Sequence, residues 1–477
     1  MKGAGHRYDL VVLGGGTAGL VSSMIAAAAG ARVALIERGR TGGDCLWTGC
    51  VPSKSLIAAA GLAHHMRHAA SVGLEPVQPR IDFSRVMEHV ARAIATIAPH
   101  DSPERLRDAG VEVIEAEARF VAPGRIETAG RTLRWRTAII ATGSHPVLPP
   151  LDGLDQAQAL TTETVWDLRE LPRRLVVLGG GPIGCELAQA FARLGSQVTL
   201  VEMADRLLLE EEPEASALIA DRLHGEDVDV RTQTRAVAVR DRELLLEGGE
   251  TLAFDRVLVA AGRAPRTAGI GLDRVGVNVD GRGAIIVDDR LRTSGHGIYA
   301  AGDVTGGLAF THVAGHHARV AASNALFHTR STVSGTIPWV TFTDPEVARV
   351  GLSEAQARER WGERVKIARF DFARSDRAIT SGEAYGFAKL VADSRGRLVG
   401  ATIASAGGGE AIAELTAWVS QGAKLAVVSR TVHAYPTLAE GPARAADEHL
   451  AARYGSPRMR AAARPVLAVL RAVEGPR

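Results

Sequence analysis

Two cysteines five positions apart are the residues of this sequence whose types and spacing most directly suggest chemistry. Cys45 and Cys50 lie in the stretch GGDCLWTGCVPSK, residues 42–54, and the 477-residue chain has only one further cysteine, Cys185. A thiolate beside an oxidisable partner is the arrangement that disulfide exchange needs. In a chain so poor in cysteine, such a pair is more typical of catalysis or metal binding than of a structural disulfide.

The residues around the pair favour redox chemistry over metal binding. Two cysteines supply half of a zinc site, and we interpret His64, His65 and His68 as one solvated helix face rather than as ligands. The segment VPSKSLIAAA after Cys50 has a helical pattern, with Pro52 in the first turn, where proline is tolerated. Cys50 is therefore expected at a helix start, where the dipole and free N–H groups lower the pKa of a thiol. We predict no metal site, and an inert, buried pair is the alternative.

A glycine-rich turn lies between a strand and a helix near the start of the chain. Gly14, Gly16 and Gly19 follow the apolar run 8–13, and a second strand-like run ends at Glu37. Such glycines permit a tight turn, let the backbone approach a pyrophosphate, and allow close packing of helix on strand. The helix start can bind the phosphates, and the carboxylate can bind a ribose. This pattern predicts a dinucleotide site.

The same pattern returns at residues 175–202. Gly179, Gly181 and Gly184 occupy the turn, and Glu202 ends the second strand. Each copy has its strand, helix and acidic residue in place, so we interpret both as binding sites. A carboxylate at the position of Glu202 repels the 2′-phosphate of NADP, so the second site is expected to prefer NADH.

Length and pattern together predict an α/β protein with several domains. We expect two Rossmann-type dinucleotide-binding domains and a C-terminal α+β domain that forms a dimer interface. The expected limits are 1–150 and 276–337 for the first domain, 151–275 for the second, 338–455 for the interface domain and 456–477 for a C-terminal tail.

Composition excludes several classes of function. Hydrophobic residues make up 46%, charged residues 23%, and the net charge is +2, so no nucleic-acid partner is expected. No apolar run reaches the ~18–20 residues that cross a bilayer, and the first residues lack the pattern of a signal peptide. We therefore expect no membrane partner and a cytoplasmic location.

A series of motifs in order resembles the FAD-dependent pyridine nucleotide-disulfide oxidoreductases, the family of dihydrolipoyl dehydrogenase, glutathione reductase and mercuric reductase. The resemblance covers residue 8 to about residue 450, nearly the whole chain. The motifs are GGGTAG with Glu37, GGDCLWTGCVPSK, ATGS at 141–144, GGGPIGCE with Glu202, TSGHGIYAAGD at 293–303, TFTDPEVARVG and YPTLAEG.

The resemblance implies the cofactors and the path of the electrons. FAD would bind at the first glycine turn, together with Gly43, Thr142, Gly143 and Asp303, and NAD(P)H at the second. Electrons would pass from NAD(P)H through FAD to a disulfide and on to a small-molecule acceptor. The C-terminal domain would form a homodimer.

The resemblance also implies roles for the residues near the flavin. Cys50 would be the flavin-proximal thiol, and Cys45 the thiol that attacks the acceptor. Lys54 would lie near the flavin and pair with Glu186, and removing one partner would strand a buried charge.

The C-terminal motif departs from that of lipoamide and glutathione reductases. Tyr435 stands where those enzymes have the acid–base histidine, whereas Glu440 keeps the position of the glutamate. An unperturbed tyrosine, with a pKa of about 10, is a poor general base. Tyrosine at this position is similar to mercuric reductase, although no cysteine follows Cys185. His433 is either a substitute base or a packing residue.

The leading hypothesis is a flavoprotein oxidoreductase that uses a Cys45–Cys50 disulfide to reduce a disulfide or Hg(II), like mercuric reductase. A second hypothesis is a quinone reductase or diaphorase whose electrons leave from the flavin directly. A third is a dihydrolipoyl dehydrogenase, and a fourth is a non-catalytic FAD-binding subunit.

Overall fold

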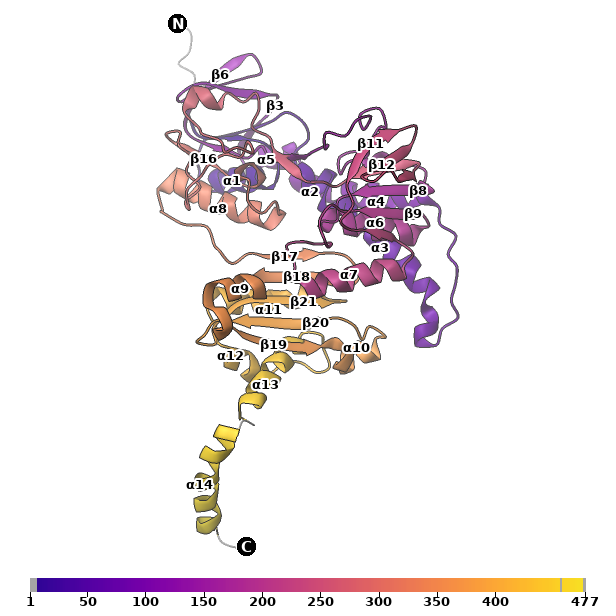
Figure 1. Cartoon of the computed structure of the whole chain (residues 1–477). Helices are drawn as coiled ribbons and strands as arrows, with labels where there is room; N and C mark the ends of the chain where they lie inside the picture. Colours follow the sequence, from indigo (N-terminus) through magenta and orange to yellow (C-terminus); the bar gives the residue numbers. More distant parts are fainter. Residues whose placement is uncertain (1–6, 455–456, 475–477) are drawn as a thin grey trace. The chain divides into compact units, whose positions relative to one another are not determined.

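The computed structural model describes residues 7–454 and 457–474, which form a mixed α/β fold (Figure 1). The chain divides into two compact units. Unit 1 comprises the described residues of Met1–Arg67, Gln78–Asp205 and Leu223–Ser334, and unit 2 those of His68–Val77, Arg206–Arg222 and Gly335–Arg477.

The first sheet of unit 1 has the strand order β3-β2-β1-β6-β5-β4, and β16 also pairs with β6. Its central strands are parallel, and their apolar residues are buried on both faces, as in a doubly wound fold. Helices α1 (Thr17–Ala28) and α8 (Thr311–Phe327) pack together on one face. The strands are β1 (Arg7–Leu13), β2 (Val33–Glu37), β3 (Val111–Glu115), β4 (Ala118–Ala122), β5 (Arg125–Thr128), β6 (Arg131–Ile140) and β16 (Ile298–Ala300).

A second parallel sheet of unit 1 has the order β10-β9-β8-β14. Helix α6 (Pro182–Leu194) follows its first strand and packs against α3 (Cys50–Arg67), which in turn packs against α4 (Phe83–Ile97). The strands are β8 (Arg174–Leu178), β9 (Gln197–Val201), β10 (Asp229–Arg231) and β14 (Arg256–Val259). A small antiparallel sheet adds β11 (Ala236–Arg240), β12 (Glu243–Leu246) and β13 (Thr251–Ala253).

A two-stranded antiparallel sheet, β7 (Ser144–Pro146) with β15 (Arg263–Pro265), brings together segments that flank the second sheet in the sequence. The short helix α2 (Gly43–Trp47) directly precedes α3. The remaining short elements of unit 1 are α5 (Pro103–Asp108), η2 (Ala98–Asp101), η3 (Val165–Asp167), η4 (Leu272–Val275) and η5 (Asp303–Thr305).

Unit 2 is built on a five-stranded antiparallel sheet in the order β17-β18-β21-β20-β19. Its strands are β17 (Pro338–Thr341), β18 (Glu346–Gly351), β19 (Lys366–Asp371), β20 (Phe387–Ala392) and β21 (Leu398–Ser405). Its helices are α9 (Glu354–Trp361), α10 (Asp376–Thr380), α11 (Gly408–Ser420), α12 (Leu425–Arg430), α13 (Glu440–Tyr454) and α14 (Pro457–Glu474), with short turns η1 (Ala69–Val72), η6 (Gly362–Arg364) and η7 (Phe372–Arg374). Helix α7 (Pro213–Gly225) begins in unit 2 and ends in unit 1.

The fold class expected from the sequence is confirmed: a mixed sheet with a parallel centre and a parallel sheet, both covered by helices, are followed by an antiparallel sheet with helices. The domain limits stay a prediction, because unit 1 contains both glycine-rich regions and unit 2 takes residues 68–77 and 206–222 as well. Residues 1–6, 455–456 and 475–477 of the expected domains lie outside the described residues. None of the helices in the described part of the chain is long and apolar enough to span a membrane.

Candidate functional site

The segment with the two cysteines lies directly against the first glycine turn. Gly42 and Gly43 have φ values of +105° and +62°, which glycine tolerates best, and the Gly42 amide donates to the Gly15 carbonyl at 2.9 Å. A Cβ on Gly43 would lie 2.6 Å from the Cα of Gly16. The glycines of both segments therefore allow two backbones to touch at this point.

The pKa values of the two thiols shift in opposite directions. Both are free; Cys45 lies within α2, and Cys50 is the first residue of α3. A hydrogen bond between the thiols is the largest cause that lowers the pKa of Cys50 to about 6, with further help from Thr311 and Lys54. The same bond and burial raise the pKa of Cys45. Cys50 is thus the thiolate near neutral pH, and Cys45 retains its proton.

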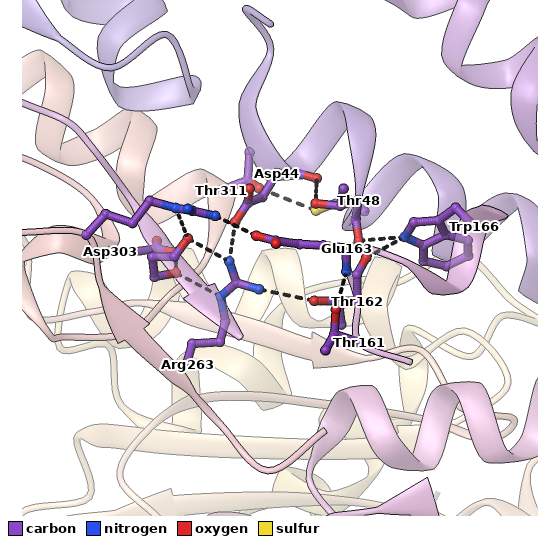
Figure 2. A network of polar contacts seen from close by, with 12 residues as sticks. Asp44, Thr48, Thr161, Thr162, Glu163, Trp166, Arg263, Asp303 and Thr311 are labelled. Atoms are coloured by element: carbon purple, nitrogen blue, oxygen red, sulfur yellow. Dashed lines mark hydrogen bonds and ion pairs between the residues drawn. The ribbon is translucent and has the colours of Figure 1, made fainter. Parts of the chain in front are cut away.

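The pKa of Cys50 is lowered as the sequence predicts, but mainly for another reason. The expectation rested on the helix start, whereas the largest cause is the Cys45 thiol. Thr311, the first residue of α8, places its Oγ1 3.3 Å from the Cys50 Sγ (Figure 2). Thr311 was not among the predicted site residues, because 261 positions separate it from Cys50 and no local pattern joins them.

Lys54 and Glu186 form an ion pair between α3 and α6. The Lys54 Nζ lies 2.8 Å from the Glu186 Oε2, and the Glu186 side chain is only 7% exposed. The structure thus brings together the two charged side chains that the family resemblance implies to be a pair. Lys54 also lies one helical turn after Cys50, and its charge favours the thiolate.

The first glycine turn has the form that a pyrophosphate needs. Gly14 has a φ of +102°, and a Cβ on Gly19 would lie 1.8 Å from the Gly14 carbonyl oxygen. Gly16 starts α1 without a side-chain cap, which leaves amides of the helix start for an anion. The Glu37 carboxylate accepts from the Gly15 amide at 2.6 Å. This donor set and this cradle fit the pyrophosphate and ribose of FAD.

The second glycine turn repeats this geometry closely. Gly179 has a φ of +111°, and a Cβ on Gly184 would lie 1.8 Å from the Gly179 carbonyl oxygen. Gly181 starts α6 without a side-chain cap. The Glu202 carboxylate accepts from the Gly180 amide at 2.6 Å. The second turn therefore fits a second dinucleotide.

The other residues expected to contact FAD lie on and beside the β7–β15 sheet. The Ser144 hydroxyl donates to the Asp303 carboxylate at 2.7 Å. The Thr142 hydroxyl donates to the Arg266 carbonyl at 2.6 Å, and the Gly143 carbonyl accepts from the Arg266 amide at 2.9 Å. The motif ATGS is thus fixed against the residues that follow β15.

The three predicted residues of the C-terminal motif lie in unit 2, whereas both thiols lie in unit 1. Tyr435 is 64% exposed, and a hydrogen bond from its hydroxyl to Asp376, at 2.6 Å, raises its pKa. Glu440 is buried at the start of α13. The catalytic roles of these residues therefore stay predictions.

His433 has partners for both of its ring nitrogens. Its Nε2 lies 3.1 Å from the Glu414 carboxylate, and its Nδ1 lies 2.9 Å from the Thr431 carbonyl. These contacts favour a packing role over that of a free base. Within residues 7–454 and 457–474, no group of three or more His, Cys, Asp or Glu side chains could hold a metal ion.

A polar network around the cysteines contains further residues that sequence reasoning missed (Figure 2). Arg263 forms an ion pair with Asp44, the residue before Cys45. Trp166 donates its Nε1 to the Thr48 carbonyl at 3.0 Å. Asp44 lies within the motif GGDCLWTGCVPSK, but its partner is 219 positions away, so no pattern in the sequence predicts the pair.

Two family models match this chain. The pyridine nucleotide-disulphide oxidoreductase model matches residues 8–318, and the dimerisation domain of the same group matches residues 337–446. A dihydrolipoyl dehydrogenase of Thermus scotoductus is 38% identical over 464 residues, which cover 92% of this chain and 97% of the relative. A mercuric reductase of Streptomyces lividans is 37% identical over 448 residues, which cover 91% and 94%.

Solved structures give the same result. LpdA from Mycobacterium tuberculosis superposes with a TM-score of 0.85 at 28% identity, over 92% of this chain and 99% of that one. The HOCl-induced flavoprotein disulfide reductase RclA from Escherichia coli superposes with a TM-score of 0.83, also at 28% identity, over 92% and 99%.

Proposed function

The chain belongs to the pyridine nucleotide-disulphide oxidoreductase family, and from that premise we propose that Cys45 and Cys50 are the disulfide through which electrons leave the protein. Members of this family are enzymes that use FAD and NAD(P)H. The observation that carries the residue assignment is the placement of the two free thiols: Cys45 lies in α2 and Cys50 starts α3, one helical turn before Lys54, which is paired with Glu186. A low-pKa thiolate beside a protonated thiol is the layout of a dithiol–disulfide couple.

The two glycine turns would hold the two cofactors. FAD bound at the first turn would supply the redox chemistry that links NAD(P)H to the disulfide. Glu37 and Asp303 would bind its ribose and ribityl hydroxyls, and the amides at the start of α1 its phosphates. Lys54, held by Glu186, would supply a fixed positive charge near Cys50.

The second site would prefer NADH. Glu202 accepts from the Gly180 amide and, at 2.7 Å, from the Ala204 amide, so its carboxylate is held at the end of β9. A carboxylate there can accept from the two ribose hydroxyls but repels a 2′-phosphate. Glu202 therefore supports NADH as the reductant.

The residues of the thiol pair suggest how the acceptor is reduced. One NAD(P)H converts the disulfide to one thiol and one thiolate, and oxidation of this pair back to the disulfide passes the two electrons to the acceptor. Cys50 would keep its thiolate, and Cys45 would attack the acceptor after losing its proton. Tyr435 is a poor base for that proton, because the Asp376 contact raises its pKa further.

We propose a small disulfide or Hg(II) as the acceptor, with lipoamide used less efficiently. A soft metal ion binds thiolates directly, so it depends less on a histidine base than dithiol–disulfide exchange does. The name of the Streptomyces lividans relative supports this choice. The match to the dimerisation domain supports a homodimer, and we propose the cytoplasm as its location.

The test is NADH oxidation with lipoamide, a low-molecular-weight disulfide, Hg(II) and a quinone, in the wild type and in Cys45→Ser. We expect the disulfide or Hg(II) to be reduced by the wild type and at least a hundredfold more slowly by the variant. Cys185→Ser is the matched control, since this third thiol is buried within α6. Unchanged turnover of every acceptor in Cys45→Ser would show that electrons leave from the flavin, as in a quinone reductase.

A further inference from the structure

The dithiol segment, which we define as residues 44–50, is held at two points by side chains from elsewhere in unit 1 (Figure 2). At one point the Asp44 carboxylate forms an ion pair with the Arg263 guanidinium. At the other point the Thr48 carbonyl accepts from the Trp166 Nε1 at 3.0 Å. One fastened residue directly precedes Cys45, and the other lies two residues before Cys50.

The two fastening side chains are joined by a third residue. The Trp166 Nε1 also donates to the Thr162 carbonyl at 2.6 Å, and the Arg263 guanidinium donates to the Thr162 hydroxyl at 3.4 Å. We call Thr162, Trp166 and Arg263 the clamp. Asp44 and Thr48 are therefore held by side chains that also contact each other through Thr162, rather than by two independent contacts.

The clamp is itself anchored to the rest of unit 1. The Arg263 Nε donates to the Ser144 hydroxyl at 2.8 Å, and Ser144 donates to Asp303. The segment that carries Thr162 is held by a bond from the Leu160 amide to the Val257 carbonyl of β14, at 2.8 Å. Atoms that touch the dithiol segment at both points are thus tied to two sheets.

Backbone position decides whether the two sulfurs can bond. A disulfide requires Cβ atoms about 3.5–4.5 Å apart and a narrow range of torsion angles. The clamp contacts are made while both thiols are free. If the loop shifts when the sulfurs move into bonding geometry, part of this stabilisation is lost, and the clamp then favours the dithiol form.

We propose that the clamp is a positioning device that favours the dithiol form of Cys45 and Cys50 and so sets the reduction potential of the pair. This rests on the proposed function of the pair. The balanced reaction is disulfide plus NAD(P)H, giving the Cys45 thiol, the Cys50 thiolate and NAD(P)⁺: the S–S bond breaks, each sulfur gains one electron of the hydride pair, and Cys45 keeps the proton. Weakening the clamp makes the disulfide form more favourable, and the potential becomes more negative.

The test measures the thiol couple directly and does not depend on turnover. FAD-loaded wild type, Trp166→Phe and Asp44→Asn are equilibrated with mixtures of reduced and oxidised dithiothreitol, and free thiols are counted by alkylation and mass spectrometry. Trp166→Phe keeps an aromatic ring but removes the donor, and Asp44→Asn removes the charge. Glu163→Gln is the matched control, because Glu163 pairs with Arg266 in the same network (Figure 2).

We expect each clamp variant to lower the dithiol-to-disulfide ratio at least tenfold, which is about 30 mV for a two-electron couple, and the control to stay within threefold. FAD content and thermal unfolding establish that the variants fold; if Asp44→Asn does not fold, Trp166→Phe decides. If the dithiol-to-disulfide ratio of the folded clamp variants falls by less than tenfold, or rises, the proposal about the clamp is overturned. A wild type whose thiols never interconvert overturns the proposed function as well, so the two failures are distinguishable.

Discussion

The Cys50 thiol shows how a few neighbours determine the chemistry of one residue. Its hydrogen bond with Cys45 has the largest effect on its pKa, and Thr311 and Lys54 act in the same direction against the cost of burial. Lys54 is in turn held by the buried carboxylate of Glu186. The charge that favours the thiolate is therefore fixed in place and needs no rearrangement when the thiol ionises.

The thiolate of Cys50 should form as the pH rises through about 6, because the pKa of Cys50 is lowered to that value. In Lys54→Met the attraction is lost, and we expect the midpoint to move to higher pH by about 1 unit. The measurement is a pH titration of the long-wavelength absorbance of the reduced, FAD-loaded protein. Lys424→Met, an exposed lysine of unit 2, is the control.

The same titration also tests the assignment of the flavin-proximal thiol. We expect Cys50→Ser to abolish the long-wavelength band, whereas Cys45→Ser retains it. A band that survives in Cys50→Ser, or a midpoint that does not move in Lys54→Met, would contradict the roles given to these residues.

At the scale of elements, the two strand–turn–helix units of unit 1 are near copies of each other. In both, the third glycine of the turn packs on the carbonyl oxygen of the first, 1.8 Å from an ideal Cβ. In both, a glutamate at the end of the next strand accepts from an amide of the turn at 2.6 Å. Equal geometry at two sites makes a matched pair of substitutions possible.

Gly19→Ala and Gly184→Ala should have the same local effect and different consequences. Each methyl group would push a helix off its strand, since the clash is with backbone. We expect Gly19→Ala to lose most of its FAD, and Gly184→Ala to keep FAD but to need at least tenfold more NADH for half-maximal reduction. Cofactor absorbance and NADH titration measure both.

Gly61→Ala is the control for this pair, because a Cβ at Gly61 would meet nothing within 4 Å. It lies inside α3, where alanine is the better helix former by about 1 kcal/mol. If Gly184→Ala loses FAD while Gly19→Ala keeps it, FAD binds at the second turn rather than the first, and the assignment is wrong.

Unit 2 contains a buried cluster of charges around Lys389 of β20. The Lys389 side chain is 3% exposed, and its Nζ lies 3.3 Å from Glu212, 3.0 Å from Glu354 and in contact with Glu214. Burial alone would lower the pKa of Lys389, but these carboxylates more than offset it and raise the pKa. The cluster attaches the 206–222 segment to the sheet of unit 2.

Lys389→Met should destabilise the protein by about 3–5 kcal/mol, because it strands carboxylates of which Glu212 is almost fully buried. Urea unfolding followed by circular dichroism gives the free energy of unfolding. Lys424→Met should change it by less than about 0.5 kcal/mol, as an exposed substitution does. A loss below about 1 kcal/mol in Lys389→Met would mean that the cluster contributes little.

At the scale of the whole molecule, local patterns predicted the parts of the site that are local in sequence. Each glycine turn and its glutamate lie within one strand–helix–strand unit, and the two cysteines within one short segment. These features could be found because each motif is contiguous and has a known physical purpose. The Lys54–Glu186 pair, which spans 132 positions, was instead implied by the family resemblance.

The contacts that the sequence did not predict join segments that lie far apart in the chain. Thr311, Trp166 and Arg263 meet the dithiol segment across 261, 118 and 219 positions. The role of His433 stays a prediction; its Glu414 partner, 19 positions earlier, lies on α11. Such pairs depend on tertiary packing, which no single segment encodes.

The most direct test of the account is whether NADH electrons reach Cys45 and Cys50. Oxidised, FAD-loaded protein is mixed with NADH without air, and new thiols are alkylated and located by peptide mass mapping. The account predicts that NADH generates free thiols at both Cys45 and Cys50, so that both become alkylated. Cys185 should be alkylated to the same extent before and after NADH is added. Protein whose flavin is reduced by NADH while both residues stay unlabelled would contradict it.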